Sequence, residues 1–304
     1  MSAGVMVLVL FAALLHASWN ALVKSSPDKL LDIVLVTGAA ALFALIALIA
    51  LPFLHAPVAA SWPFIAASAV IHIVYFLLIG AAYRSGDMSH AYPLMRGTPP
   101  LLVALASGPL VGERLSAGEW CGVLCICGGI LALLLAGSAG AGNHTIHNAG
   151  SNTGQTPQRA DGSTAHHATR YALLNAIAIA GYTLVDGTGV RLSGAPAGYT
   201  VWVFLLTAPP LLVWVTAHRR TQFVRQLRDR WHLALIGGAC TLGAYMLVLW
   251  AMTQAPIAMV AALRESAILF ATAISVWVLK ERPGRSRPVA AALILLGVFV
   301  LKLA

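Results

Sequence analysis

Long apolar runs separated by short polar gaps dominate this chain. Ten of these runs reach about 20 residues, the length that an α-helix needs to cross the ~30 Å hydrocarbon core of a bilayer. In residue numbers, the runs are 3–23, 31–53, 62–83, 89–111, 116–136, 170–191, 197–217, 231–253, 257–279 and 286–303. Because backbone polar groups in lipid must be satisfied within their own segment, the pattern predicts an all-α integral membrane protein with ten transmembrane helices.

The composition agrees with a membrane protein. The 304 residues are 59% hydrophobic and 10% charged, whereas a soluble domain carries about 25% charged residues. The net charge of +9 does not indicate a nucleic-acid partner, because the positive residues lie in short gaps between apolar runs and not on one basic face. The expected partner is therefore the lipid bilayer, and the expected location is the cell inner (plasma) membrane.

One gap between the runs differs from the others. Residues 138–169 are rich in Gly, Ser, Thr, Asn and His and hold almost no large apolar residue. Such a composition cannot bury a core, so it predicts a flexible polar linker. Its four histidines could hold a metal, but their spacing matches no common site, and we expect a solvated linker with no metal and no cofactor.

The linker lies near the middle of the chain and separates two halves that align when the sequence is shifted by 168 residues. Three charged residues of the first half then meet identical residues of the second, namely Arg96 with Arg264, Glu113 with Glu281 and Arg114 with Arg282. We therefore expect a first five-helix repeat in residues 1–137 and a second in residues 170–304. Five is an odd number, so the second repeat enters the membrane from the opposite side. Inverted repeats of this kind are typical of secondary transporters that bind substrate near the midplane.

Short motifs in both halves resemble a known family. The stretches "VGERLS" and "LKERPG" occupy matching places in the two repeats, and "HASWNALVK", "AYPLMRGTPPLLVA" and "AMVAALRESAILFA" surround the intramembrane polar residues. Together they resemble the EamA type of the drug/metabolite transporter superfamily, over both halves but not over the linker. The resemblance implies the fold of two five-helix repeats and a transport activity. It implies no particular substrate, since family members move many different metabolites and many of them lack the charges at Arg96 and Arg264.

Two arginines and two acids lie deep inside predicted spans. Arg96 and Arg264 lie equally far from the start of their predicted helices. Because these two helices enter the membrane from opposite faces, both arginines approach the bilayer midplane. Each costs ~2.5–3.5 kcal/mol there unless it faces a polar cavity or a partner. Asp186 and Glu265 have either a coupling role or the simpler role of compensating these arginines. Glu265 directly follows Arg264, so about 100° separates them around a helix, and we expect each to find its partner on another helix.

Further polar residues recur at helical spacing beside these charges, which places them on shared helix faces. An arginine beside aromatic rings suits a carboxylate or phosphate attached to a planar or apolar body. The simpler alternative is interhelical packing through hydrogen bonds. The predicted substrate-binding residues are Arg96, Arg264, Tyr92, His16, Trp19, Asn20 and Tyr182; Asp186 and Glu265 are assigned to coupling or charge balance, and His72 and Tyr75 to cavity lining.

These features together predict a secondary transporter that exports a small polar or anionic metabolite, such as an amino acid or a related carboxylate or phosphate compound. Transport would use proton exchange or facilitated alternating access. Two alternatives stay open, a lipid-linked sugar flippase and a membrane-embedded enzyme. We do not expect an enzyme, because catalytic polar clusters would lie near one surface, whereas these charges lie centrally.

The distribution of Lys and Arg generates a first testable prediction, on orientation. Fourteen of these residues lie in the loops on one side of the predicted spans and three on the other. The positive-inside rule places the larger group in the cytoplasm and both termini outside, whereas the family resemblance implies both termini inside. We expect alkaline phosphatase fused to the C-terminus to be active, because it folds only outside the cytoplasm. A fluorescent C-terminal fusion with an inactive phosphatase fusion would instead establish the orientation that the resemblance implies.

Overall fold

The computed structural model describes residues 1–24, 26, 28–51, 55–85, 88–147, 162–277 and 286–304. Within these ranges the side chains of 83–92, 134–147, 162–167, 275–277 and 286–287 are not described. The described chain is helical, with no β-strand in those ranges. Its elements are α1 (Ala3–Lys24), α2 (Lys29–Ala50), the 3-10 turn η1 (Ala59–Ser61), α3 (Trp62–Ser85), α4 (Met88–Val111), α5 (Ala117–His147), α6 (Gly162–Ser193), α7 (Pro196–Met252), α8 (Ile257–Arg264), α9 (Ala267–Trp277) and α10 (Ser286–Leu303).

The helices coincide with the predicted apolar runs, but the predicted count of ten transmembrane helices is not confirmed. Helix α7 joins two predicted spans, and α8 and α9 divide a third. Among the described residues, six segments are long and apolar enough to cross a membrane: Ala3–Lys24, Lys29–Ala50, Ala59–Ala82, Ala168–Ser193, Pro196–Met252 and Ile257–Ile274. Two shorter apolar helices cover Ala117–Leu133 and Pro288–Leu303. These segments establish a multi-pass membrane protein.

The non-helical part of the predicted linker is shorter than its composition indicated. Helix α5 continues to His147 and α6 begins at Gly162, so helical backbone extends into both ends of residues 138–169. Residues 148–161 lie outside the described part of the chain. The proposed boundaries of the two repeats stay a prediction.

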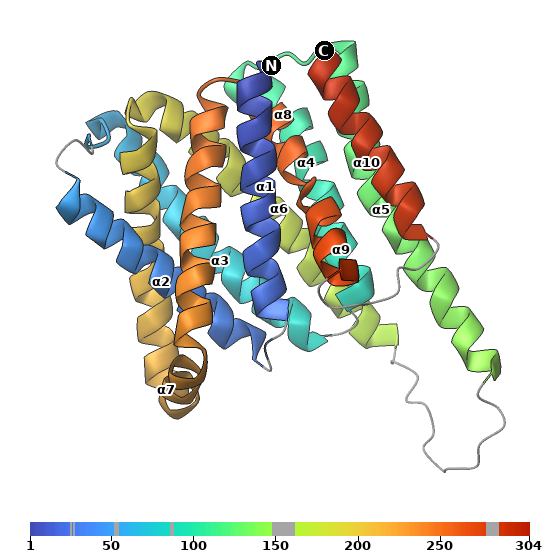
Figure 1. The fold of residues 1–304 in the computed structure, drawn as a ribbon, viewed down its shortest axis with the longest axis horizontal. Coiled ribbons are helices and arrows are strands. Elements are labelled where there is room, and N and C mark those ends of the chain that lie inside the picture. Colours follow the sequence, from blue (N-terminus) through green and yellow to red (C-terminus); the bar gives the residue numbers. More distant parts are fainter. Residues whose placement is uncertain (25, 27, 52–54, 86–87, 148–161, 278–285) are drawn as a thin grey trace.

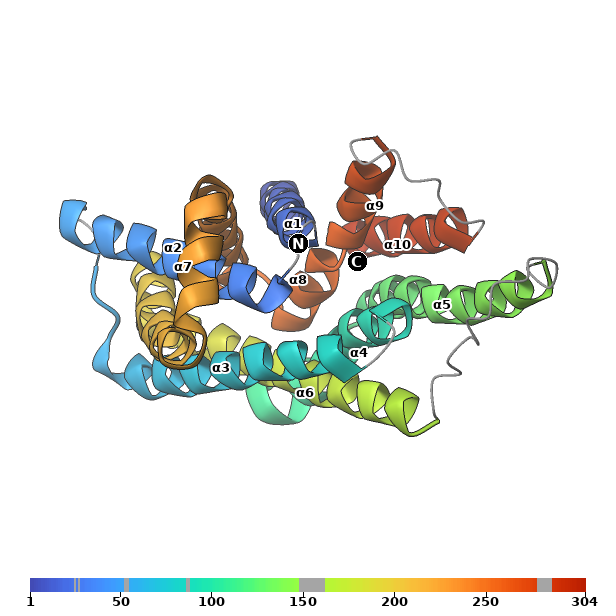
Figure 2. The same cartoon turned by 90° about the horizontal axis from the view of Figure 1, so that it is seen from below.

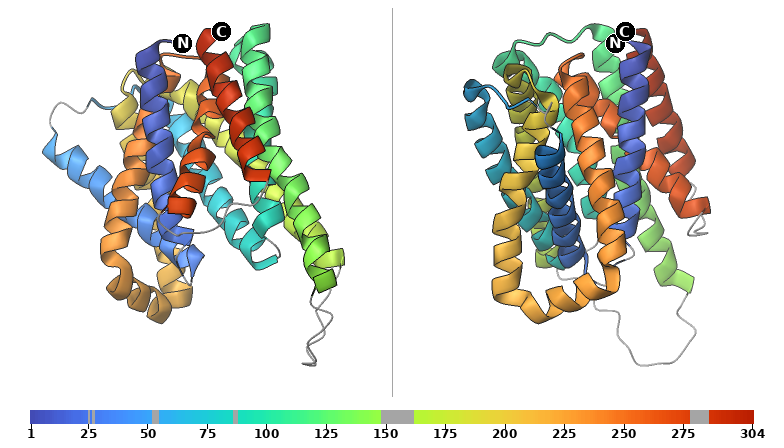
Figure 3. Two further views of the ribbon diagram at one scale, coloured as in Figure 1. Left: turned by 45° about the vertical axis from the view of Figure 1, so that its right-hand side comes forward. Right: turned by 60° about the vertical axis from the view of Figure 1, so that its left-hand side comes forward.

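Helix α7 folds back on itself in a U (Figure 3). Arg219 and Arg230 have non-helical backbone angles, φ −138° and −130°, at the two corners of the U. Asp28 and Asp32, at the start of α2, hold these corners: Arg219 Nη2 lies 2.5 Å from Asp28 Oδ2, and Arg230 Nε lies 2.8 Å from Asp32 Oδ2. Acids at a helix N-terminus also interact favourably with the helix dipole. The segment of α7 between Arg219 and Arg230 is therefore bound to the first turn of α2.

The helices pack in pairs around α1 and α8. Helix α2 packs against α7, α3 against α6 and α5 against α10, while α1 contacts α7, α8 and α9. Figures 1 and 2 show α1 near the middle of the bundle, with α3, α4 and α6 together on one side of it. Both termini lie at the same end of the molecule (Figure 1), as an even number of membrane crossings requires.

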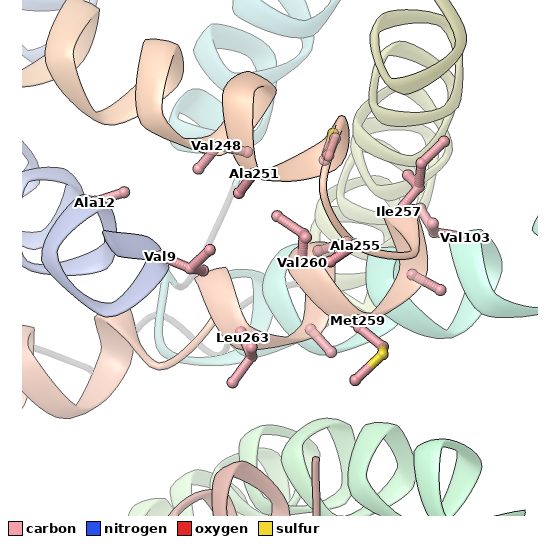
Figure 4. Close-up of a cluster of buried hydrophobic side chains, with 14 of the residues drawn as sticks. Val9, Ala12, Val103, Val248, Ala251, Ala255, Ile257, Met259, Val260 and Leu263 are labelled. Atoms are coloured by element: carbon pink, nitrogen blue, oxygen red, sulfur yellow. The ribbon is translucent and has the colours of Figure 1, made fainter. Parts of the chain in front are cut away.

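Helix α8 lies at the centre of the largest apolar cluster. All of its residues from Ile257 to Arg264 are buried, and Figure 4 shows its side chains between those of α1, α4 and the end of α7. The neighbours are small or β-branched, for example Val9, Ala12 and Val103. Because lipid is as apolar as these side chains, close van der Waals packing stabilises such contacts. Helix α8 is therefore held on every side, which fixes the charges at its C-terminal end.

The N-terminal end of α8 is fixed by Glu113, which lies in the "VGERLS" motif. Its two carboxylate oxygens accept hydrogen bonds from the Ile257 backbone N–H at 2.9 and 3.0 Å. Arg191 of α6 donates to Glu113 Oε1 at 2.7 Å and to the carbonyls of Met252 and Ala255 at 2.7 and 2.9 Å. Glu113 therefore joins four segments: the α4–α5 connection, α6, the end of α7 and α8. Its partner in the repeat alignment, residue 281, lies outside the described residues.

This arrangement generates a second prediction. Replacing Glu113 by Ala leaves the Ile257 N–H without its acceptor and removes the ion-pair partner of Arg191, which keeps its two carbonyl acceptors. The unmade hydrogen bond costs ~1–3 kcal/mol. We expect the E113A protein to unfold at a clearly lower temperature than wild type when thermal unfolding is followed by circular dichroism in detergent. E113Q is the matched control and should lose less, because its amide oxygen still accepts from Ile257. Equal unfolding temperatures for E113A and wild type would contradict the role of Glu113 in holding the start of α8.

Candidate functional site

A helix break creates the charged centre of the molecule. Helix α8 ends at Arg264 and α9 begins at Ala267, with a tight turn at Glu265 and Ser266. In this turn, the N–H of Glu265 donates to the carbonyl of Ala262 at 3.0 Å, the tighter spacing of a 3-10 helix. The turn rotates Glu265 away from the position it would have in a regular α-helix.

Glu265 lies between the two arginines that the sequence analysis singled out. Its Oε1 atom is 3.6 Å from Arg96 Nη1 and 3.6 Å from Arg264 Nε. These distances give ion pairs but exceed those of a good hydrogen bond. Glu265 thus has a partner on another helix, Arg96 of α4, and its contact with the adjacent Arg264 is an ion pair without a hydrogen bond among the described residues. Arg96, Arg264 and Glu265 are 8%, 6% and 1% exposed, so two buried guanidinium groups share one carboxylate.

His16 of α1 completes this cluster. Its Nε2 atom contacts Nη2 of Arg96, and its Nδ1 atom lies 3.3 Å from Nε1 of Trp19. Arginine and tryptophan only donate hydrogen bonds, while a neutral imidazole accepts at one nitrogen alone. Taken by themselves, the five described residues Arg96, Arg264, Glu265, His16 and Trp19 therefore contain more hydrogen-bond donors than acceptors.

Asp186 of α6 belongs to a different buried cluster. Its Oδ1 atom accepts from the Tyr199 hydroxyl at 2.9 Å, and its Oδ2 atom accepts from the Tyr245 hydroxyl. Both tyrosines come from α7, one from each arm of the U. The described ion pairs of the two arginines go to Glu265 and not to Asp186, so the tyrosine hydroxyls take the place that the sequence analysis assigned to an arginine.

Two interior cavities bring most of the predicted site residues together. The larger has a volume of about 70 Å³, and the smaller about 30 Å³. The predicted residues that border the larger cavity are His16, Trp19, His72, Tyr75, Tyr182 and Arg264. Those that border the smaller cavity are Trp19, Asn20, Tyr75 and Arg96. The two arginines thus face cavities that are separated by Trp19 and Tyr75, which border both. The side chain of Tyr92 lies outside the described residues.

Several lining residues were not found from the sequence. Tyr245, Phe204 and the threonines at 37, 207 and 241 border the larger cavity, and Asn175 borders the smaller one. The ring of His72 stacks on Tyr182 with ring centroids 4.2 Å apart and meets the edge of Tyr245 at 5.6 Å. A tyrosine or threonine alone in an apolar span gives only a weak signal, because its hydroxyl can bond its own helix.

Comparison with known proteins identifies the fold and the family. The model of the EamA-like transporter family matches twice, over residues 3–135 and residues 169–303. A solved crystal structure of a protein without further description is similar over 100% of this chain and 98% of its own, with a TM-score of 0.74 and 19% identity. That likeness establishes the fold alone. No curated protein shows significant similarity to this sequence.

The tyrosine cluster generates a third prediction. Replacing Asp186 by Leu leaves the hydroxyls of Tyr199 and Tyr245 buried without their acceptor, at ~1–3 kcal/mol each. We expect D186L to lower the temperature of thermal unfolding in detergent, and D186N, which keeps one acceptor oxygen, to lower it less. The double variant D186L/Y199F should recover part of the loss, because one buried hydroxyl is removed together with its partner. Additive losses in the double variant would show that Tyr199 and Asp186 do not depend on each other.

Proposed function

The chain belongs to the EamA-like transporter family, within the drug/metabolite transporter superfamily, and we propose that it is a secondary transporter of a small organic anion. The observation that carries this proposal is the guanidinium of Arg264 at the larger cavity. Its Nε has no hydrogen-bond partner among the described residues, and the Glu265 carboxylate stands 3.6 Å away. A buried cation with an unused donor is expensive at bilayer depth. An anionic substrate supplies an acceptor with a negative charge, so its entry is favoured over that of a neutral or cationic molecule.

The proposed transport pathway passes through the two cavities. In this proposal, residues 1–137 and 170–304 form two inverted five-helix repeats with ten crossings in all, and residues 138–169 connect them. Transporters built from inverted repeats often bind their substrate at interrupted helices near the midplane. The turn at Glu265 and Ser266, between α8 and α9, interrupts a helix in this way and stands beside Arg264 at the larger cavity. Movement of one repeat against the other would expose the arginines to each side in turn.

Glu265 is the proposed coupling residue. Its carboxylate occupies the position between the guanidiniums that a substrate carboxylate or phosphate would need. Protonation of Glu265 would free both arginines for the substrate, and the arrival of substrate would favour that proton. This competition would link substrate binding to proton binding. Exchange against protons and the export direction stay predictions, as does a second coupling role for Asp186.

A fourth prediction tests the arginines. The planar guanidinium holds a carboxylate or phosphate by paired hydrogen bonds, whereas lysine supplies only a point charge. Loss of one such charge-assisted bond costs ~1.5–3 kcal/mol, or about 10–150-fold in affinity. We expect R96K and R264K to insert normally and to bind the substrate more weakly by about this factor. The exposed Arg220 offers a matched control, and R220K should bind as wild type does.

The substrate for this measurement comes from comparing metabolite uptake and efflux between a deletion strain and an overexpressing strain. Binding is then measured on the purified wild-type and variant proteins. Wild-type affinity in both R96K and R264K would mean that the arginines hold helices together and do not contact the substrate, which would overturn the proposed site.

A further inference from the structure

The larger cavity has an unusual charge composition for a site that would bind an amino acid. Its charged lining residue is Arg264, and no Asp or Glu stands among the lining residues that the structure describes. Zwitterionic ligands need a negative or accepting group near their ammonium, because a buried charge without a partner is costly. The described wall of this cavity therefore offers a partner for a negative group and none for a positive one.

The two acids nearest to the cavity are already engaged by donors. Asp186 is shielded from the cavity by Tyr245, which borders the cavity and donates its hydroxyl to the Asp186 carboxylate. The second oxygen of Asp186 accepts from Tyr199. Glu265 is 1% exposed and lies between Arg96 and Arg264. Neither carboxylate is placed to receive the ammonium of a ligand in this cavity.

Two threonine hydroxyls of the wall are engaged and a third is not. Thr37 and Thr207 donate to carbonyl oxygens of their own helices, Ile33 at 2.8 Å and Val203 at 2.7 Å. The Thr241 hydroxyl has no hydrogen-bond partner among the described residues. A hydroxyl can donate or accept, so Thr241 and Arg264 together offer donors to an oxyanion, while it is the charge of Arg264 that disfavours an ammonium.

Aromatic rings form much of the remaining wall. They come from α1, α3, α6 and both arms of α7, and they are Trp19, Tyr75, Phe76, Tyr182, Phe204 and Tyr245. Such rings suit a flat apolar body. A ring face also attracts a cation, but an ammonium here would share a small cavity with the guanidinium of Arg264, which repels it.

From these observations we infer that the substrate is a carboxylate or related oxyanion with a short planar or apolar body and without a cationic amino group. Arg264 binds the anionic group, Thr241 donates the second hydrogen bond, and the ring wall holds the body. The inference rests on the proposed function and narrows it, because it separates simple organic acids from amino acids.

Three ligands with closely related skeletons test the inference on the purified wild-type protein. They are propionate, which is an anion, alanine, which adds an ammonium to it, and ethylamine, which lacks the carboxylate; all three are small enough for a cavity of about 70 Å³. Isothermal titration calorimetry at neutral pH should show alanine binding at least about tenfold more weakly than propionate, and ethylamine more weakly still. Equal or tighter binding of alanine would overturn the inference, and so would the absence of binding by all three ligands.

A second test uses a variant that adds a negative charge to the described wall of the larger cavity. T241D introduces a carboxylate into the wall and should reverse the preference, so that alanine binds more tightly than propionate. A folded T241D protein with the wild-type preference would contradict the assignment of Thr241. The wild-type comparison stands even where T241D does not fold.

Failure of this inference is distinguishable from failure of the proposed function. If R264K weakens the binding of alanine and wild type prefers alanine, the anion site holds and the exclusion of amino groups is wrong. If propionate binds equally well to wild type, R96K and R264K, the arginine site itself is wrong.

Discussion

Two guanidinium groups that share one carboxylate form the constraint on which this structure depends. Removing charged groups from water costs several kcal/mol for each ion, and attraction to a partner offsets this cost only with good geometry. Here Glu265 stands 3.6 Å from a nitrogen of each arginine, so it satisfies neither fully. A centre of this kind is stable only where further groups supply acceptors. At Arg264, whose Nε has no hydrogen-bond partner among the described residues, a bound anion would be such a group.

The surrounding fold is organised to hold this centre in place. Helix α8 is buried along its whole length, and Glu113 fixes its first residue to α6 and to the end of α7. Because both the sides and the start of α8 are fixed, the position of Arg264 at its end is also fixed. The turn that follows is short, so Glu265 keeps its place between the arginines. Packing far from the charges therefore determines their geometry.

The two buried acids, Asp186 and Glu265, differ in the groups that hold them. Asp186 is held by two tyrosine hydroxyls from opposite arms of α7, while Glu265 is held by guanidinium groups. Carboxylates in such different surroundings respond differently to protonation, since one loses hydrogen-bond donors and the other loses ion pairs.

The sequence alone located the helices and the arginines. Hydropathy is a local property, and bilayer thickness sets the length of each apolar run, so the apolar runs coincide with helices in the structure even where α7 joins two of them. The repeat alignment also picked out Arg96 and Arg264, and helical spacing led to His16, Trp19 and Tyr182 around the cavities. Residues such as Arg96 stand out because a charge in lipid is costly wherever the helix packs.

Tertiary structure decided which groups meet. Helical periodicity could not bring Glu265, in the turn after α8, within 3.6 Å of Arg96 Nη1, because Arg96 comes from a helix that is distant in the chain. It also gave no reason to pair Asp186 with Tyr199 and Tyr245, or to leave the hydroxyl of Thr241 without a partner. These contacts join helices that are distant in the chain and depend on their rotation and packing. Spacing along one helix determines which face a side chain lies on, but only the assembled bundle determines what that face meets.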